Sequence, residues 1–159
     1  MKLSTWGRTA AIDTDQLFLM VDPHWDLPYD DARTALVLRQ CLQLTESFFS
    51  ADYENVLIAG NAIHDAIDLN PVIPGLLRLG RVFHLTLDPS EDAVLRRTAD
   101  DPDRSPTHLR DDLHLLRAKR STWSAPLDNS TLTPLETFQK IAHLVQTGEG
   151  EIHGPLADS

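Results

Sequence analysis

Short apolar runs alternate with amphipathic segments along almost the whole chain, and this alternation constrains the fold more than any other feature. Runs that predict buried strands lie at residues 9–12, 55–60, 81–87 and 123–127. Segments with helical spacing of apolar residues lie at 31–50, 71–79, 90–98, 107–120 and 133–145. This order predicts an α/β fold with parallel strands, right-handed crossovers and helices on both faces of the sheet.

The length and composition predict one domain over residues 1–147, followed by a frayed tail at 148–159. No apolar run reaches the ~18–20 residues of a membrane span, and the first residues contain no stretch typical of a signal peptide. The one cysteine, Cys41, excludes an internal disulfide and favours a reducing, cytoplasmic location.

The net charge of −10 argues against a nucleic-acid partner, which requires cations opposite its phosphates. Seven of the 14 Lys and Arg residues nevertheless lie between Arg96 and Arg120. This segment could hold a polyanion, but aspartates are interleaved with its cations, and charge alone favours a solvated helix face.

Polar side chains follow the predicted strands at the edge where parallel α/β sheets bind ligands: Asp13 with Asp15, then Asn61, then Asp88. The Asp13–Asp15 pair has two equally supported interpretations. One is a magnesium site or a base for a substrate hydroxyl, and the other is a cap for the following helix. Taken alone, Asn61 is more typical of a turn than of a catalytic position.

Three arginines, Arg96, Arg97 and Arg104, could clamp a phosphate, because guanidinium groups stabilise charge on a transferring phosphoryl group. Alternatively, Arg96 and Arg97 solvate the end of a helix and favour its dipole. The seven histidines show no metal-binding spacing, and no G-x-S-x-G sequence suggests a serine hydrolase.

Taken in order, several segments resemble the P-loop small-molecule kinases of the shikimate kinase, gluconate kinase and chloramphenicol phosphotransferase group. They are the strand-end acidic motif at 11–17, the strand at 55–61, the strand and helix at 83–97, the lid position at about 99–110, and the segment at 127–136. The resemblance covers about Trp6 to Val145. It implies a three-layer, P-loop NTPase-like sheet and transfer of a phosphoryl group from ATP, with Mg²⁺, to a small hydroxylated acceptor.

The resemblance also implies roles for individual residues. Asp15 would be the catalytic base, Asp13 a substrate or magnesium contact, and Arg97 and Arg104 the phosphate clamp on the lid. Two further residues, Asn61 and Arg96, would bind the substrate. The residues that would lie against the nucleotide are Asp128, Asn129 and Ser130.

The main departure from that group is the phosphate-binding loop, because no G-x-x-x-x-G-K-[ST] sequence occurs in the 159 residues. Only nine residues precede Ala10, whereas the group places a strand, the loop and a helix there. We therefore expect a late-starting reading frame and a weak or inactive enzyme, or else a natural loss that leaves a non-catalytic binding or interaction module. Without that strand, its neighbours would expose their edges, which favours a homodimer through an exposed sheet edge.

Overall fold

The computed structural model describes residues 6–23, 31–60, 69–99, 105–119 and 124–154. The residues group into two compact units. The first takes in Met1–Arg81 and His153–Asp158, and the second takes in Val82–Ile152. Each unit is described by itself.

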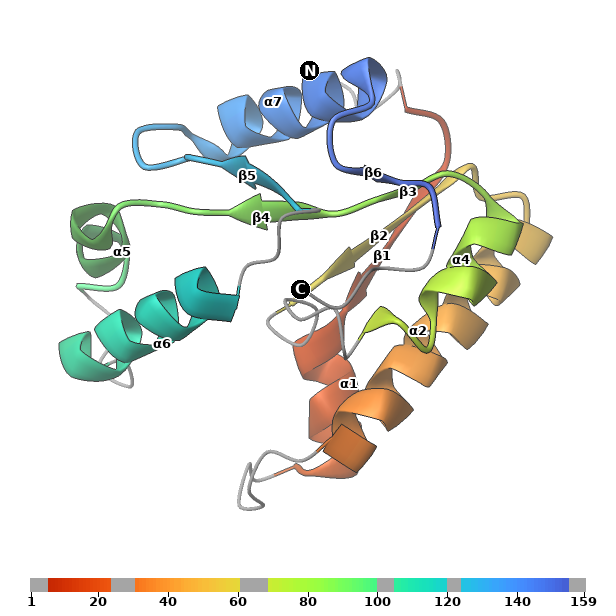
Figure 1. The fold of residues 1–159 in the computed structure, drawn as a ribbon, viewed down its shortest axis with the longest axis horizontal. Coiled ribbons are helices and arrows are strands. Elements are labelled where there is room, and N and C mark those ends of the chain that lie inside the picture. Colours follow the sequence, from red (N-terminus) through yellow and green to blue (C-terminus); the bar gives the residue numbers. More distant parts are fainter. Residues whose placement is uncertain (1–5, 24–30, 61–68, 100–104, 120–123, 155–159) are drawn as a thin grey trace. The chain divides into compact units, whose positions relative to one another are not determined.

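The first unit is built on two parallel strands. Strand β1 (Thr9–Asp13) pairs with β2 (Asn55–Ala59), and the register runs from Thr9 opposite Asn55 to Asp13 opposite Ala59 (Figure 1). The helices that the described residues of this unit form are α1 (Thr14–Val21), α2 (Asp31–Ser50) and α4 (Ile73–Leu79). Strands β1 and β2 and helices α2 and α4 lie where the sequence predicts a strand or a helix, and α1 begins directly after Asp13.

The core of this unit lies on one face of the strand pair. Residues of β1 alternate between buried and exposed, and Ile12 packs with Leu17, Phe18, Val37 and Cys41 from the helices. Val56 and Ile58 of β2 pack against the same cluster. On the other face, Ala11 of β1 and Leu57 and Ala59 of β2 are exposed, and Asn55 is half-buried. Among the described residues, one face of the pair is therefore better covered than the other.

The second unit contains two further strand pairs. Strand β4 (Leu85–Leu87) runs parallel to β5 (Ala125–Leu127), whereas β3 (Val82–Phe83) runs antiparallel to β6 (Glu151–Ile152). Its helices are α5 (Glu91–Arg97), α6 (Pro106–Lys119) and α7 (Pro134–Thr147). The parallel pairs agree with the predicted α/β class, and the antiparallel pair was not predicted.

Two sequence predictions in this unit need correction. The run at 81–87 is two strands separated by His84, whose N–H donates to the Gly150 carbonyl (2.9 Å) and whose carbonyl accepts from the Ala125 N–H (3.1 Å). The expected frayed tail likewise begins too early, because Glu151 and Ile152 form β6. Gly148 and Gly150 have φ values of 84° and 75°, which turn the chain from α7 back toward β3.

Polar side chains cap two helices of this unit. Ser90 accepts a hydrogen bond from the Ala93 N–H at the start of α5. At the start of α7, the Thr133 hydroxyl accepts from the Glu136 N–H (3.2 Å), and Glu136 Oε2 accepts from the Thr133 N–H (2.8 Å). This reciprocal pair is the capping box that the sequence T-P-L-E predicts.

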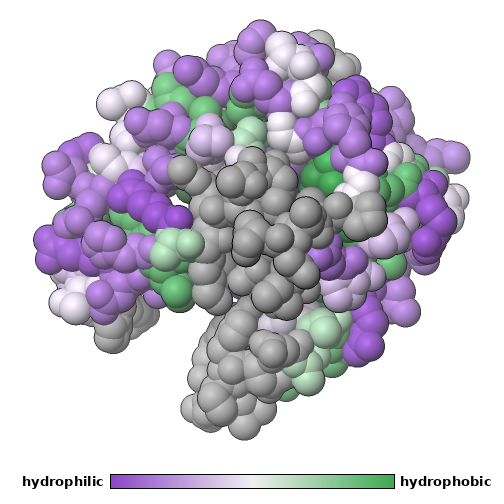
Figure 2. All heavy atoms as spheres, in the orientation of Figure 1, coloured by the Kyte–Doolittle hydropathy of each residue, from purple (hydrophilic) through white to green (hydrophobic). Residues whose placement is uncertain are grey.

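Hydrophilic residues dominate the described surface in the view of Figure 2, and hydrophobic ones show between them in separate places. Among the helices of the described residues, none combines the length and the apolar character needed to cross a membrane.

Candidate functional site

The carboxyl ends of β1 and β2 meet, because the parallel register places Asp13 opposite Ala59. Asp13 is the N-cap of α1, and its Oδ1 accepts a hydrogen bond from the Asp15 N–H (2.9 Å). The capping interpretation of Asp13 is therefore realised in the structure. Asp13 is exposed and Asp15 is half-buried. The catalytic role of Asp15 and the metal role of Asp13 stay predictions.

Between these two aspartates, Thr14 makes a close contact that the sequence analysis missed. Thr14 is fully buried, and its Oγ1 has no hydrogen-bond partner among the described residues. A Cβ added to Gly60, just after β2, would lie 1.7 Å from this oxygen, and Gly60 has a φ of 146°. Only glycine fits this close approach. In the sequence, the signal for this contact is a glycine directly after an apolar strand.

Two predicted site residues, Asn61 and Arg104, lie outside the described residues. Their predicted roles in substrate binding and phosphate clamping are therefore untested.

In the second unit, two carboxylates lie directly after the ends of the neighbouring strands β4 and β5. Leu87 lies opposite Leu127, so Asp88 and Asp128 each follow a paired position, and the Asp88 N–H donates to the Leu127 carbonyl (2.9 Å). The parallel pairing of two strands that are 40 residues apart in the chain (85 and 125) thus assembles this edge.

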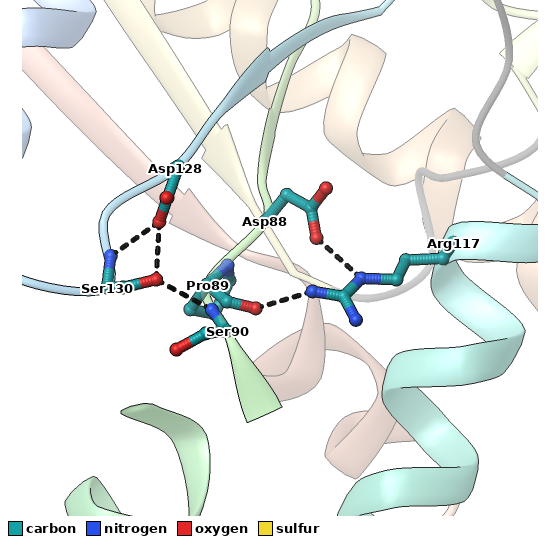
Figure 3. Close-up of polar contacts among 6 residues, drawn as sticks. All are labelled: Asp88, Pro89, Ser90, Arg117, Asp128 and Ser130. Carbon is teal, nitrogen blue, oxygen red and sulfur yellow. Dashed lines mark hydrogen bonds and ion pairs between the residues drawn. The ribbon is translucent and has the colours of Figure 1, made fainter. Parts of the chain in front are cut away.

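Arg117 reaches from α6 to this edge, as Figure 3 shows. Its Nε donates to Asp88 Oδ1 (2.7 Å), and its Nη2 donates to the Pro89 carbonyl (2.8 Å). Both side chains are partly exposed, so the ion pair contributes little net stability, about 0–1 kcal/mol. The two contacts do hold the Arg117 guanidinium beside Asp88 and Pro89. No sequence signal distinguishes Arg117, because in a helix of mixed charge it looks like any solvated cation.

Asp128 faces its own turn (Figure 3). Asp128 Oδ1 accepts from the Ser130 N–H (2.8 Å) and from the Ser130 hydroxyl. Ser130 Oγ in turn accepts from the Ser90 N–H (2.7 Å), which joins this turn to the start of α5. The hydrogen bonds from the Ser130 side chain and backbone lower the pKa of Asp128, and Arg117 and Lys140 add smaller effects in the same direction. Asp128 is therefore an anion at neutral pH.

The predicted clamp residue Arg97 also binds this turn. Its Nη2 donates to the carbonyl oxygens of Asn129 (2.5 Å) and Leu132 (3.3 Å). Asn129 is buried, and its Oδ1 has no hydrogen-bond partner among the described residues. The structure thus brings Arg97 together with the predicted nucleotide-binding residues, whereas Arg96 is exposed on the last turn of α5.

A cavity of about 480 Å³ lies in the same unit, along β5 and α7. Pro126 and Leu127 line it from the strand, and Lys140 and His143 line it from the helix. Its lining includes none of Asp88, Arg117 and Asp128, so it is separate from the polar edge. We assign no chemistry to it.

A magnesium role for Asp13 is compatible with the donors present. Mg²⁺ is commonly held by one or two carboxylates together with waters and substrate phosphates. The cap bond uses Oδ1 of Asp13 and leaves Oδ2 outside the cap. Within the described part of the chain, no group of three or more His, Cys, Asp or Glu residues could hold a metal by itself.

Comparison with known proteins identifies the fold and no more. No protein-family model matches the chain, and no curated protein matches it. Among solved structures, the Deinococcus radiodurans tunicamycin resistance protein is similar, with a TM-score of 0.54 and 17% identity over 92% of this chain and 86% of that chain. The likeness shows that the two chains share an α/β fold. At 17% identity the likeness carries no statement about substrate or activity.

Proposed function

We propose that this chain is a phosphotransferase of the small-molecule kinase type, which transfers a phosphoryl group from Mg²⁺-ATP to a small hydroxylated acceptor. The observation that carries the proposal is the kinase-like fold together with the Asp13–Asp15 pair at the carboxyl end of β1. Ligands of parallel α/β sheets bind at that end of the strands. The three-layer P-loop NTPase arrangement is part of the same proposal.

Asp15 is the proposed general base. It lies in the first turn of α1, half-buried, where the Asp13 cap holds its backbone N–H. A carboxylate in this position can accept the proton of an acceptor hydroxyl as that oxygen attacks the γ-phosphorus of ATP, while the bond from this phosphorus to ADP breaks and ADP leaves. Asp13 would hold the substrate or Mg²⁺ through the oxygen outside the cap.

The proposed phosphate contacts come from the arginines. Arg97 would act on phosphate only if it released the carbonyls of Asn129 and Leu132. Arg96 and Arg104 complete the proposed set, and residues 128–130 are proposed to lie against the nucleotide.

A second function follows from a specific property of the sequence. Residues 1–159 contain no G-x-x-x-x-G-K-[ST] loop, whose backbone N–H groups and lysine hold nucleotide phosphates. A chain that lacks these contacts could bind the acceptor without phosphorylating it. The alternative is therefore a non-catalytic binding or interaction module with a kinase-like fold.

Acceptor-dependent release of ADP tests the proposal. The assay uses millimolar Mg²⁺-ATP and a panel of hydroxylated compounds: gluconate, shikimate, chloramphenicol and, because of the structural neighbour, tunicamycin. We expect Asp15→Asn to lower turnover roughly 10²–10⁴-fold, because Asn keeps the size but cannot accept the proton. Asp112→Asn, on the exposed surface of α6, is the matched control and should retain activity.

The outcomes separate the two functions. An acceptor that binds in calorimetry with no ADP released favours the binding module. Turnover that Asp15→Asn leaves unchanged would contradict the assignment of the base. Neither binding nor turnover with any member of the panel would count against both functions for this class of acceptor.

A further inference from the structure

The turn between β5 and α7, residues 128–132, is held together by bonds of its own and by bonds from a distant part of the chain. Within the turn, the Leu132 N–H donates to the Asn129 carbonyl (3.2 Å), and Asp128 Oδ1 accepts from the Ser130 N–H (2.8 Å). Further donors come from residues 32 to 40 positions earlier, at the two ends of α5. The shape of this β5–α7 turn therefore depends on α5 as well as on its own sequence.

The two ends of α5 contact the turn separately. At the N-cap, the Ser90 N–H donates to Ser130 Oγ (2.7 Å; Figure 3). At the last residue of this seven-residue helix, Arg97 Nη2 donates to the carbonyls of Asn129 (2.5 Å) and Leu132 (3.3 Å). The turn is thus fixed to both the start and the end of α5.

The Arg97 contact bridges two carbonyls of the turn. Asn129 is 8% exposed, so water has little access to it, and buried backbone carbonyls require hydrogen-bond donors. A carbonyl oxygen has two lone pairs, and on Asn129 the Leu132 N–H and Arg97 supply a donor for each. The Leu132 carbonyl directly precedes Thr133, the N-cap of α7. Arg97 therefore joins the middle of the turn to the start of α7.

The neighbouring Arg96 provides a comparison within the same helix. Both arginines lie in the last turn of α5, where a positive charge favours the helix dipole. Among the described residues, however, no hydrogen bond joins Arg96 to the β5–α7 turn, and Arg96 is exposed. The bridge thus distinguishes Arg97 from a cation that only favours the end of the helix.

We propose that Arg97 is a positioning residue, which fixes the β5–α7 turn and does not contact the transferred phosphoryl group. To reach a phosphate, its guanidinium would have to lose its bonds to both carbonyls. The inference rests on the proposed function in one respect, which is that residues 128–130 lie against the nucleotide. Arg97 then acts on the nucleotide indirectly, by holding the residues that contact it.

Amide hydrogen exchange, followed residue by residue by NMR, tests the positioning role without any nucleotide. Arg97→Met keeps the apolar stem and removes the donors. The Leu132 N–H should then exchange at least about tenfold faster than in the native chain, because the turn loses the donor that bridges its carbonyls. The Thr137 N–H, which donates to the Thr133 carbonyl (2.9 Å) within α7, is the internal reference and should not change.

Arg96→Met is the matched control, because it removes the same charge from the same helix turn, and it should leave the exchange of Leu132 at the native rate. Arg97→Lys keeps the charge but lacks the planar fork of the guanidinium, so its rate should be intermediate, and it replaces Arg97→Met if that variant does not fold. Equal exchange of Leu132 in the Arg96→Met and Arg97→Met variants would overturn the proposal. So would an equal acceleration of Leu132 and Thr137, which indicates a general loss of stability.

Steady-state kinetics then separates positioning from a phosphate clamp. In the assay for acceptor-dependent release of ADP, Arg97→Met should raise the KM for ATP about tenfold and leave kcat within about threefold. A fall in kcat at an unchanged KM would assign Arg97 to the phosphate and overturn the proposal. Unchanged kinetics with faster exchange of Leu132 would support the positioning role and show that residues 128–130 do not contact the nucleotide. Absence of turnover counts against the proposed function alone, because the exchange measurement needs no nucleotide.

Discussion

The close approach of Gly60 to Thr14 restricts position 60, beside the candidate site of the first unit, to glycine. Gly60→Ala would place a Cβ 1.7 Å from Thr14 Oγ1, at a φ of 146° that L-residues rarely adopt. We expect this change to lower the free energy of unfolding by about 2–4 kcal/mol. Urea denaturation followed by circular dichroism measures the loss.

Thr14→Ala in the same chain separates the two causes of that loss. It removes the clashing oxygen but not the backbone strain, so the double variant should recover part of the stability. Additive losses in the double-mutant cycle would show that the two residues do not interact as the geometry indicates.

Cys41 provides a pH-dependent prediction. Burial raises the pKa of its thiol from 9.0 to about 11. The folded state therefore holds the proton more tightly than the unfolded state. The resulting stabilisation is complete below pH 9 and is lost as the pH rises to 11. We expect the free energy of unfolding to fall by about 2–3 kcal/mol more across this window in the native chain than in Cys41→Ala. If the free energy of unfolding fell equally with pH in the native chain and in Cys41→Ala, the prediction would be contradicted.

At the scale of elements, helix starts were the most predictable features. Ser90, Thr133 and Glu136 cap α5 and α7 as their sequences indicate, because a cap involves residues only three apart. Strands were less predictable. The run at 81–87 looks like one strand, and only the pairing of His84 with Gly150 and Ala125 divides it.

The capping box of α7 gives a prediction for an element. Thr133→Ala removes the acceptor of the Glu136 N–H, and we expect it to lower the free energy of unfolding by about 0.5–2 kcal/mol. Thr131→Ala, in the preceding turn, is the control with an exposed threonine. Thermal denaturation compares the two variants, and an equal shift in Tm would argue against the cap.

The same box has a pH dependence of known sign. The hydrogen bonds from the Thr133 backbone and side chain lower the pKa of Glu136 below its ordinary 4.5. The stabilisation by the carboxylate is therefore present above pH 4.5 and is lost as the pH falls through the lowered pKa. The difference in stability between the native chain and Thr133→Ala should shrink in acid.

For the whole molecule, the decisive question is nucleotide binding. In P-loop enzymes the phosphate-binding loop supplies the main contacts to the nucleotide phosphates, and residues 1–159 contain no such sequence. We expect calorimetric titration with Mg²⁺-ATP to show weak binding or none. A dissociation constant in the micromolar range would mean that another segment holds the phosphates, and Arg117→Gln would then show whether the polar edge of β4 and β5 takes part.

The sequence by itself determined the α/β class, the positions of most helices and strands and the helix caps. These depend on apolar periodicity and on side chains that bond within a few residues. The tertiary structure alone decided that Arg117 meets Asp88, that Gly60 meets Thr14, and that β6 pairs with β3. These contacts join residues 29 or more positions apart. No local pattern encodes them, because they form only when packing brings distant segments together.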